Sequence, residues 1–541
     1  MKRILFSLVA LTIALPAISQ GNINGRVTCK GKPMSGVSVS DGVNIVQTDA
    51  SGRYSMHSTK AEGMVFIITP AGFRAETIDG LRPRFWQALY LPAEQSETHD
   101  FKLVPQDQRR YKVLFPTDVH LTGVERRHDL ERFKKWVLPA ISQEASEATG
   151  ACYSFNLGDF THDVYWYDYN FTEADGLRFL QDINYPTLMY TVMGNHDHDG
   201  SIVGKAVDTR AAWMQKDCWG PGAYSVNIGE DHWIFVDDIV YINVEGKGKK
   251  AKNIKGDRSY NHELTEAQLS WIEKDLALVK SSTKVYFCCH CPFLKASGTG
   301  IYLPKEQMDK LSALCSRFEK RVTVFSGHIH KFEFCENANY PKFMQCSLPA
   351  TSGIMWETRE DWPLYSGDGC DGGIWVGDFG RGIIPSYHYH TFTGGEAYYR
   401  FYDMNEVGKA YKESKGVQEQ QKLFPETRQN YADKKWKNQV FFNYWGEYPG
   451  DVVEMFENGK PLKVSHEPYE DPTKNFAYDV AILENPVVHH SNRASDSCAH
   501  MYEAKTKSAK SAITVKVSDK NGNVKYEETF QRPYTFNPSG K

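Results

Sequence analysis

The sequence of 541 residues predicts an α/β core between two β-rich regions. From Tyr111 onward, short apolar runs that suit buried strands alternate with segments of helical periodicity, which is typical of an α/β domain. Before residue 105 and after residue 373, short strand patterns recur between Gly, Pro, Asp and Ser turns. A chain of this length is too long for one hydrophobic core, so we expect several domains.

The first 19 residues predict a secretory signal peptide. Lys2 and Arg3 precede an apolar segment at 4–15, and 17–19 (AIS) has the small residues of a cleavage site. The apolar segment is short for a membrane span, and no later stretch is long and apolar enough to be one. We therefore expect an exported chain, cleaved near Ser19 and located in the periplasm or outside the cell.

Net charge and cysteine spacing exclude some classes of binding partner and structural site. The net charge of -4 gives no basic bias, so a stable nucleic-acid partner is not expected. The 11 cysteines are odd in number, and their spacing indicates neither a disulfide framework nor a zinc knuckle. Cys288, Cys289 and Cys291 fit a buried strand that contains small thiols.

Residues 20–105 predict a small β-sandwich, because short strand patterns alternate with turn residues at regular spacing. The segments 25–27, 36–39 and 48–54 resemble carboxypeptidase-regulatory-like modules of exported bacterial proteins. These segments carry no evident site, so a spacer role is favoured over ligand binding.

Residues 106–360 predict the α/β domain. Helical periodicity is present at 128–142, 171–182 and 264–279, the last beginning with the capping-box spacing of Thr265 and Gln268. A hairpin of buried strands is expected over 223–241. Residues 361–541 predict a β-rich domain, with strands near 398–402, 439–444, 451–456 and 511–517, a hairpin turn at Asn521-Gly522, and a helix or long loop over 404–437.

Five apolar runs, each read as a strand, are followed by side chains that bind metals. Asp118 and His120 follow the first run, and the others precede Asp159, Asn195, His290, and the pair His328 and His330. In α/β sheets ligands gather beyond the carboxyl ends of strands. Residues two apart in an extended chain point to one side, so each paired set can hold one ion. The mixed nitrogen and oxygen donors suit Mn, Fe, Zn or Ni.

These seven side chains can supply four ligands to each of two divalent ions if one carboxylate bridges them. The ions would then lie roughly 3.5–4 Å apart, as in two-metal hydrolases. Two dications bring +4 and the two aspartates return -2, so the site stays positive and attracts a phosphate ester. A metal-bridging hydroxide could then attack phosphorus.

The five segments resemble the calcineurin-like metallophosphoesterase pattern D-x-H, GD, GNH(D/E), H and GHxH, from about Tyr111 to Trp356. The resemblance implies a four-layer core with two central sheets and flanking helices, of the exported bacterial type with β-rich flanking domains. It also implies that Asp118, His120, Asp159 and His330 hold the first ion. Asp159 would bridge to a second ion held by Asn195, His290 and His328.

The same resemblance implies that His196 is not a ligand. It would protonate the leaving alkoxide or stabilise the transferring phosphoryl group. Many family phosphatases carry an aspartate that orients this histidine at the place where His162 stands here. We therefore expect Asp163 or Asp197 to orient His196. Purple acid phosphatases carry a tyrosine there, and its absence argues against that subclass.

The substrate is expected to be a phosphorylated small molecule or a glycan phosphate. Tyr165, Trp166 and Tyr167 could form a stacking wall for a sugar or base, or could instead anchor the next helix. Lys331 could contact the substrate phosphate. Monoesterase, phosphodiesterase and nuclease activities stay open, as does oligomeric state. The alternative from a different class is an inactive glycan-binding protein of the cell envelope.

Overall fold

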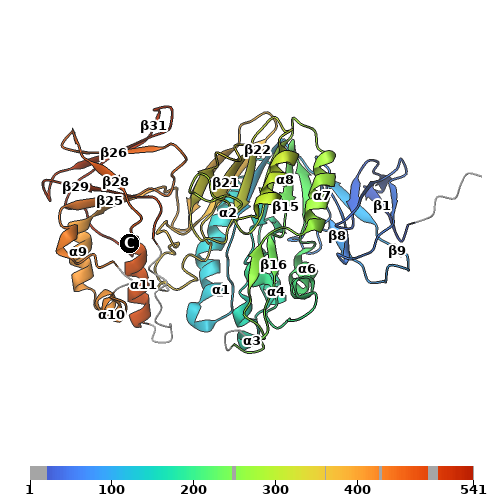
Figure 1. The fold of residues 1–541 in the computed structure, drawn as a ribbon, viewed down its shortest axis with the longest axis horizontal. Coiled ribbons are helices and arrows are strands. Elements are labelled where there is room, and N and C mark those ends of the chain that lie inside the picture. Colours follow the sequence, from blue (N-terminus) through green and yellow to red (C-terminus); the bar gives the residue numbers. More distant parts are fainter. Residues whose placement is uncertain (1–20, 247–250, 360, 426–428, 485–496, 540–541) are drawn as a thin grey trace, which may run out of the picture.

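The computed structural model describes residues 21–246, 251–359, 361–425, 429–484 and 497–539 (Figure 1). The predicted signal peptide lies outside these residues. Figure 1 shows three parts in a row, with the N-terminal β region at one end, the α/β core in the middle and the C-terminal region at the other end. No helix in the described ranges combines the length and apolar character that a membrane crossing needs.

The N-terminal region has the two sheets expected of a small sandwich. Val27, Val39 and Phe66 lie in the shared hydrophobic core. The first sheet consists of β1 (Ile23–Cys29), β2 (Lys32–Pro33), β5 (Arg53–Met56), β7 (Phe73–Ala75), β9 (Glu97–Thr98) and β10 (Phe101–Pro105). The second consists of β3 (Ser38–Ser40), β4 (Ile45–Gln47), β6 (Met64–Ile67) and β8 (Trp86–Ala88).

The first core sheet has the order β13-β12-β11-β22-β23. Its members are β11 (Arg110–Phe115), β12 (Ala151–Asn156), β13 (Leu188–Thr191), β22 (Gly373–Gly380) and β23 (Ser386–Thr391). The first three strands are parallel, and β22 lies antiparallel to the whole length of β11. This sheet continues to Thr391 and so extends past the predicted domain boundary at residue 360.

The second core sheet has the order β14-β15-β18-β19-β21-β20. Its members are β14 (Tyr224–Ile228), β15 (Asp231–Phe235), β18 (Lys284–Cys288), β19 (Val322–Ser326), β20 (Glu333–Glu336) and β21 (Phe343–Ser347). The predicted hairpin over 223–241 is confirmed by the antiparallel pair β14 and β15. The strands β15, β18, β19 and β21 pair in parallel, as β11, β12 and β13 do in the first sheet.

The two sheets pack face to face through aromatic rings. The rings of Phe115 and Phe325 stack with centroids 4.4 Å apart, and those of Phe155 and Trp233 lie 4.9 Å apart. At the amino ends of the strands, the Tyr111 hydroxyl donates to Asp231 Oδ2 over 2.5 Å and joins the sheets directly. Aromatic burial of this extent makes the sheet–sheet interface the centre of the core.

Helices cover the outer faces and complete the four layers. Against the first sheet lie α1 (Asp129–Arg132), the π-helical turn Phe133–Val137, α2 (Leu138–Glu147), α4 (Glu173–Asp182) and α6 (Trp213–Trp219). Against the second lie α7 (Glu266–Ala277) and α8 (Lys305–Cys315). Thr265 caps α7 by accepting from the Gln268 amide, but the Gln268 side chain bonds to the Asp237 amide instead of closing the box.

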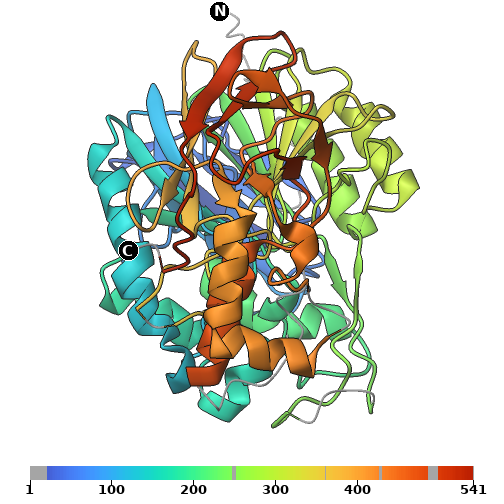
Figure 2. The ribbon, with the colours of Figure 1, turned by 90° about the vertical axis from the view of Figure 1, so that its left-hand side faces the viewer.

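The C-terminal region contains two four-stranded sheets and helices on one side of them (Figure 2). The strands are β24 (Arg400–Asp403), β25 (Gln439–Asn443), β28 (Val464–His466) and β29 (Met501–Lys505), then β26 (Val452–Glu457), β27 (Lys460–Pro461), β30 (Ile513–Ser518) and β31 (Val524–Phe530). The polar 404–437 stretch forms α9 (Met404–Glu413), α10 (Lys415–Leu423) and a 3₁₀ turn at Lys434–Trp436. The sequence did not suggest α11 (Pro472–Glu484).

The C-terminal region contacts the core beside the last metal-type motif. His500 is buried and its Nε2 lies 3.1 Å from the Phe332 carbonyl and 3.2 Å from Asp368 Oδ2. Asp368 in turn accepts from the Phe332 amide over 2.9 Å. Lys331 Nζ donates to the Ser497 carbonyl. These bonds fix the chain directly after His330.

All 11 cysteines are unpaired, so no disulfide supports any of the three parts. Ten of them are buried and Cys152 is half-buried. Burial raises the pKa of the Cys288 and Cys289 thiols well above the ordinary value. These two residues therefore pack as small neutral thiols within and next to β18.

Candidate active site

The five predicted segments converge beyond the carboxyl ends of parallel strands in both core sheets. From the first sheet, the loop after β11 carries Asp118 and His120, and the loops after β12 and β13 carry Asp159 and Asn195. From the second sheet come the residues that follow β18 and β19: His290, His328 and His330. The structure thus brings all seven predicted ligand positions together.

The backbone at these positions differs from the extended chain that we expected. Asp118, His120, Asp159, His328 and His330 all have positive φ, between 48° and 67°. Left-handed conformations are rare for residues with a Cβ and cost roughly 1 kcal/mol or more each. The explanation from alternating side chains is therefore wrong, and it is tight left-handed turns that aim each pair. The amides of Asp118 and His120 donate to the Gly158 and Asp159 carbonyls, which holds two of these loops together.

The three motif glycines stand where neighbouring functional groups leave no room for a Cβ. A Cβ at Gly158 would lie 2.5 Å from His290 Nδ1, and one at Gly194 would lie 2.2 Å from Asp159 Oδ1. At Gly327 it would lie 1.9 Å from Thr117 Oγ1. Gly158 alone of the three also has a left-handed φ, of 94°. Close approach, more than sharp turning, is the reason for glycine here.

The two aspartates lie at the centre of the imidazoles. Asp159 Oδ2 is 3.3 Å from His290 Nε2 and 3.7 Å from His120 Nε2. Asp118 Oδ1 is 3.1 Å from His330 Nε2. Asp159 therefore contacts members of both predicted ligand sets, as a bridging carboxylate would.

Ring nitrogens and an amide oxygen, all of which can carry a lone pair, also lie close to one another. His120 Nε2 lies 3.1 Å from His330 Nε2, and His328 Nδ1 lies 3.2 Å from His290 Nε2. The Asn195 Oδ1 atom is 3.1 Å from His290 Nε2. Within the described residues, Asp118, His120 and His330 form one group of donors, and Asp118, Asp159 and His290 another, each spanning at most 4.8 Å. Such converging lone pairs fit divalent cations.

Burial and proximity set the charges of the cluster. Burial alone would raise the pKa of Asp118, but His330 beside it lowers that pKa to about 2. Burial lowers the pKa of His120 well below its ordinary value and that of His328 to about 3. Burial also acts to lower the pKa of His290, but the Asp159 carboxylate raises it to about 10. These shifts favour an ionised Asp118 carboxylate and neutral His120 and His328 rings.

His196 stands beside this cluster with Asp163 and Arg258. Its Nδ1 lies 2.8 Å from Asp163 Oδ1 and 2.8 Å from Arg258 Nη2. Arg258 also donates to Asp163 through Nε over 2.5 Å and through Nη2 over 3.0 Å. Asp163 is fully buried, whereas the His196 side chain keeps 20% of its surface exposed. The contacts hold Nδ1 and leave Nε2 free to exchange a proton.

Of the two aspartates suggested to orient His196, the structure places only Asp163 against the ring. Asp197 is buried and accepts from the Asp159 and Gly194 amides over 2.8 and 2.9 Å. Burial, with Glu173 adding to it, raises the pKa of Asp197 well above the ordinary value. The suggested orienting role of Asp197 is therefore corrected, since its carboxyl fixes the backbone of two motif loops.

Comparison with protein families agrees with this geometry. Residues 111–332 match the family model for calcineurin-like phosphoesterase. Residues 21–106 match the model for the N terminal of calcineurin-like phosphoesterase, and residues 368–525 the model for its C terminal. The chain belongs to the calcineurin-like phosphoesterases. It is a metal-dependent hydrolase of phosphoric esters with the four-layer core and β-rich flanks of that family.

Solved structures similar to this phosphoesterase are distant. A dimetal phosphatase from Danio rerio is 13% identical, with 52% of this chain and 99% of that chain covered and a TM-score of 0.32. A purple acid phosphatase from yellow lupin (Lupinus luteus) seeds is also 13% identical, with coverages of 67% and 68% and a TM-score of 0.35. A 5'-nucleotidase from Candida albicans is 9% identical, with coverages of 53% and 52% and a TM-score of 0.28. No curated protein matches the sequence.

The aromatic segment after the second motif of this phosphoesterase has mixed roles. Trp166 is 1% exposed and donates to Thr161 Oγ1 over 2.8 Å. The suggestion that it forms part of a stacking wall is therefore corrected, because its ring packs in the core. Tyr165 is half-buried, and its ring lies 5.1 Å from that of His162 and under the Arg127 guanidinium. Tyr167 donates to Asp199. Tyr165 thus stays nearest to the site, because His162 itself lies 4.0 Å from His196, ring to ring.

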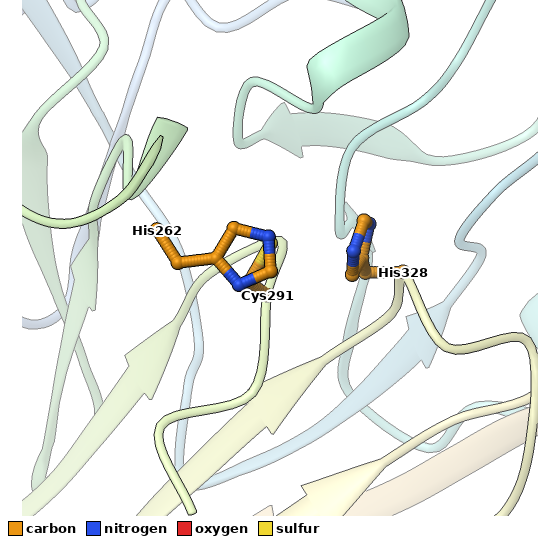
Figure 3. Close-up of side chains that lie close together, drawn as sticks. All are labelled: His262, Cys291 and His328. Atoms are coloured by element: carbon orange, nitrogen blue, oxygen red, sulfur yellow. The ribbon is translucent and has the colours of Figure 1, made fainter. Parts of the chain in front are cut away.

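Two functional neighbours of the metal-type cluster had no sequence signal. Arg258 lies in a polar loop of the phosphoesterase without periodicity, and His262 lies in the short strand β17 (Tyr260–His262), which pairs with β16 (Ile239–Tyr241). Figure 3 shows the His262 ring facing His328, with Cys291 behind it. No apolar run or glycine marks either residue, so only the folded chain shows their proximity.

Proposed function

We propose that this phosphoesterase is an exported enzyme that hydrolyses a phosphate ester at a dinuclear metal centre. The observation that carries the proposal is the convergence of seven donor side chains, five of them around Asp118 and Asp159, with His196 beside them. The donor set is mixed nitrogen and oxygen, which suits Mn, Fe, Zn or Ni.

The proposed ligand sets follow the contacts. Asp118, His120, Asp159 and His330 would hold one ion, and Asp159 would be shared with a second ion at Asn195, His290 and His328. Two dications against two carboxylates leave a net charge of about +2, which favours an anionic phosphoryl group over a neutral substrate. When bound, the ions supply a nucleophile at neutral pH and neutralise charge on the phosphoryl oxygens.

His196 is proposed as the proton donor to the leaving oxygen. Asp163 accepts from Nδ1 and therefore stabilises the protonated ring, while Nε2 carries the proton toward the ester. Arg258 holds both oxygens of Asp163 and keeps the carboxylate in place. Arg258 is a positioning residue in this scheme, because it acts through Asp163 and the imidazole.

The proposed substrate is a phosphorylated small molecule or a glycan phosphate. Tyr165 and Tyr167 are the half-buried rings of the proposed wall, and the Tyr165 ring lies beside His162. Lys331 is a weaker candidate for phosphate contact, because its Nζ already donates to the Ser497 carbonyl.

The test is hydrolysis by the purified mature chain, supplied in turn with Mn, Zn, Fe and Ni. p-Nitrophenyl phosphate and bis-p-nitrophenyl phosphate are compared under each metal. Faster turnover of the monoester supports a monoesterase, and faster turnover of the diester supports the diesterase or nuclease alternative. Metal analysis completes the test: two ions per chain are expected, and a chain that binds none and hydrolyses neither compound would be the inactive binding protein.

Export is proposed from the charged and apolar start of the sequence. Amino-terminal sequencing of the protein recovered from cell fractions tests it. A periplasmic or secreted product that begins at Gln20 is expected. An intact Met1 in the cytoplasmic fraction would contradict the proposal.

A further inference from the structure

A second cluster of metal-type side chains overlaps the proposed dinuclear centre at one residue, His328, and adds two side chains that the centre does not use. It consists of His262, Cys291 and His328, whose ligand atoms all lie within 4.8 Å of one another (Figure 3). The rings of His262 and His328 are 5.0 Å apart and nearly perpendicular. Two imidazoles and a sulfur are a softer donor set than the carboxylate-rich centre.

The side chains that distinguish this cluster have no other polar partner. In the part of the chain that the structure describes, the ring nitrogens of His262 and the sulfur of Cys291 make no hydrogen bond or ion pair. Cys291 is fully buried, whereas His262 is half-buried, so a cation could enter from the imidazole side. Cys289 differs, because its thiol lies 3.0 Å from the Cys291 carbonyl oxygen and is directed elsewhere.

His328 belongs to both clusters. Its Nδ1 faces His290 Nε2 over 3.2 Å, which is the side of the proposed second ion. A neutral imidazole offers one lone pair, and its other nitrogen carries a proton. His328 therefore cannot serve an ion beside His290 and another beside Cys291 at the same time without losing that proton.

We propose that His262, Cys291 and His328 form an inhibitory site for thiophilic divalent cations such as Zn²⁺. The cation binds His262, His328 and the Cys291 sulfur, and the thiol proton passes to solvent as the sulfur–metal bond forms. A Cys-His₂ set with an open position is within the range of zinc chemistry in proteins. Binding there takes His328 from the second catalytic ion, so excess zinc inhibits whereas Mn²⁺, which avoids thiolate, does not.

The experiment uses the mature chain loaded with Mn²⁺ and then titrated with Co²⁺ or Zn²⁺. Co²⁺ reports a thiolate ligand through its sulfur-to-cobalt charge-transfer absorption. The band is expected in the parent chain and in the matched control Cys289→Ser, and is expected to vanish in Cys291→Ser and weaken in His262→Asn. Both site variants should keep Mn²⁺-dependent hydrolysis and need about 10–100-fold more Zn²⁺ for the same inhibition.

The inhibition readout rests on the proposed hydrolase function, but the absorption band does not. A Cys291-dependent band in a chain that hydrolyses no phosphoester would overturn the function and keep the site. Active enzyme without a band, a band that persists in Cys291→Ser, or equal zinc inhibition in all four chains would overturn the site. If Cys291→Ser fails to fold, the half-buried His262→Asn decides the outcome by the same two readouts.

Discussion

The two core sheets contribute differently to the active site, although both present the carboxyl ends of parallel strands. The first sheet supplies both carboxylates, the amide, His120 and the proposed proton donor. The second supplies three imidazoles and no carboxylate to the proposed metal ligands. Negative charge therefore comes from one layer, and most of the nitrogen donors come from the other.

This difference between the sheets predicts which substitutions reduce activity most. The Asp159 carboxylate contacts histidines of both layers, so its negative charge acts on both halves of the site. Each histidine of the second sheet would supply one nitrogen ligand to one ion. We therefore expect substitutions in the first sheet to cost more activity than substitutions in the second.

The largest effect is expected for Asp159→Asn. The change keeps the shape and the oxygen that accepts from the His196 amide over 2.7 Å, but it removes the charge that the two proposed ions would share. Hydrolysis of p-nitrophenyl phosphate should fall by about 10³-fold or more. Asp107→Asn, in the exposed joint before β11, is the matched control and should be unchanged. Retained activity of Asp159→Asn in metal-replete buffer would break the bridging assignment.

His330→Ala tests the imidazole layer. His330 contacts Asp118 and His120, and its removal should lower metal occupancy and reduce turnover by about 10²-fold. Raising the Mn²⁺ concentration should restore part of the loss, because the carboxylates stay in place. Metal analysis and kinetics at several Mn²⁺ concentrations measure this. A loss as large and as unrecoverable as that of Asp159→Asn would erase the difference between the sheets.

His196→Ala separates proton transfer from metal binding. The variant should keep two ions per chain and lose roughly 10²-fold in turnover of phenyl phosphate, which has a poor leaving group. The loss should be smaller with p-nitrophenyl phosphate, whose leaving oxygen needs less help. Loss of metal in this variant would show that His196 is structural.

Arg258→Ala is expected to have a smaller effect, because Arg258 acts through Asp163. Turnover should fall by about tenfold with little change in KM, and added guanidinium should restore part of it. Arg258→Lys should restore less than free guanidinium, since lysine cannot bind both Asp163 oxygens. Arg321→Ala, an exposed ion-pair residue at the start of β19, is the control. A change confined to KM would mean that Arg258 contacts substrate instead.

Asp231→Asn addresses the far end of the two sheets and should leave activity unchanged. Burial raises the pKa of Asp231 from 3.8 to about 6, so the folded state holds its proton more tightly than the unfolded state does. That stabilising term is complete below pH 4 and is lost as pH rises through about 6. The variant should therefore gain up to about 3 kcal/mol over the parent above pH 7, and little at pH 4. Urea unfolding of both proteins at the two pH values checks this.

The core and the convergence of the seven proposed ligands could be predicted because strand ends, glycines and metal-type residues coincide in the sequence. Glycine at 158, 194 and 327 marks close approach, and a lone His290 gains meaning only within the ordered set. The family models match the predicted core and both flanks. The reason offered for the i, i+2 pairs was wrong, because left-handed turns at Asp118 and His328 cannot be read from apolar periodicity.

Other features depend on contacts between segments far apart in sequence. Arg258 is 62 residues from His196, and its loop has no pattern that predicts their contact. Trp166 lies beside two exposed or half-buried tyrosines, and only packing decides which ring is covered. The strand β22 follows a polar segment that signalled a domain end, yet it returns to pair with β11.

The contacts between His500, Asp368 and Phe332 limit where the chain can be truncated and which parts can be exchanged between proteins. Removing everything after residue 360 would strip β22 and β23 from the first sheet and expose the edge of β11. Ending the chain after β23 would spare the sheet but would take away the buried imidazole and the carbonyl that hold the segment following His330. Neither cut yields an autonomous catalytic module, so the C-terminal part must travel with the hydrolase in any domain exchange.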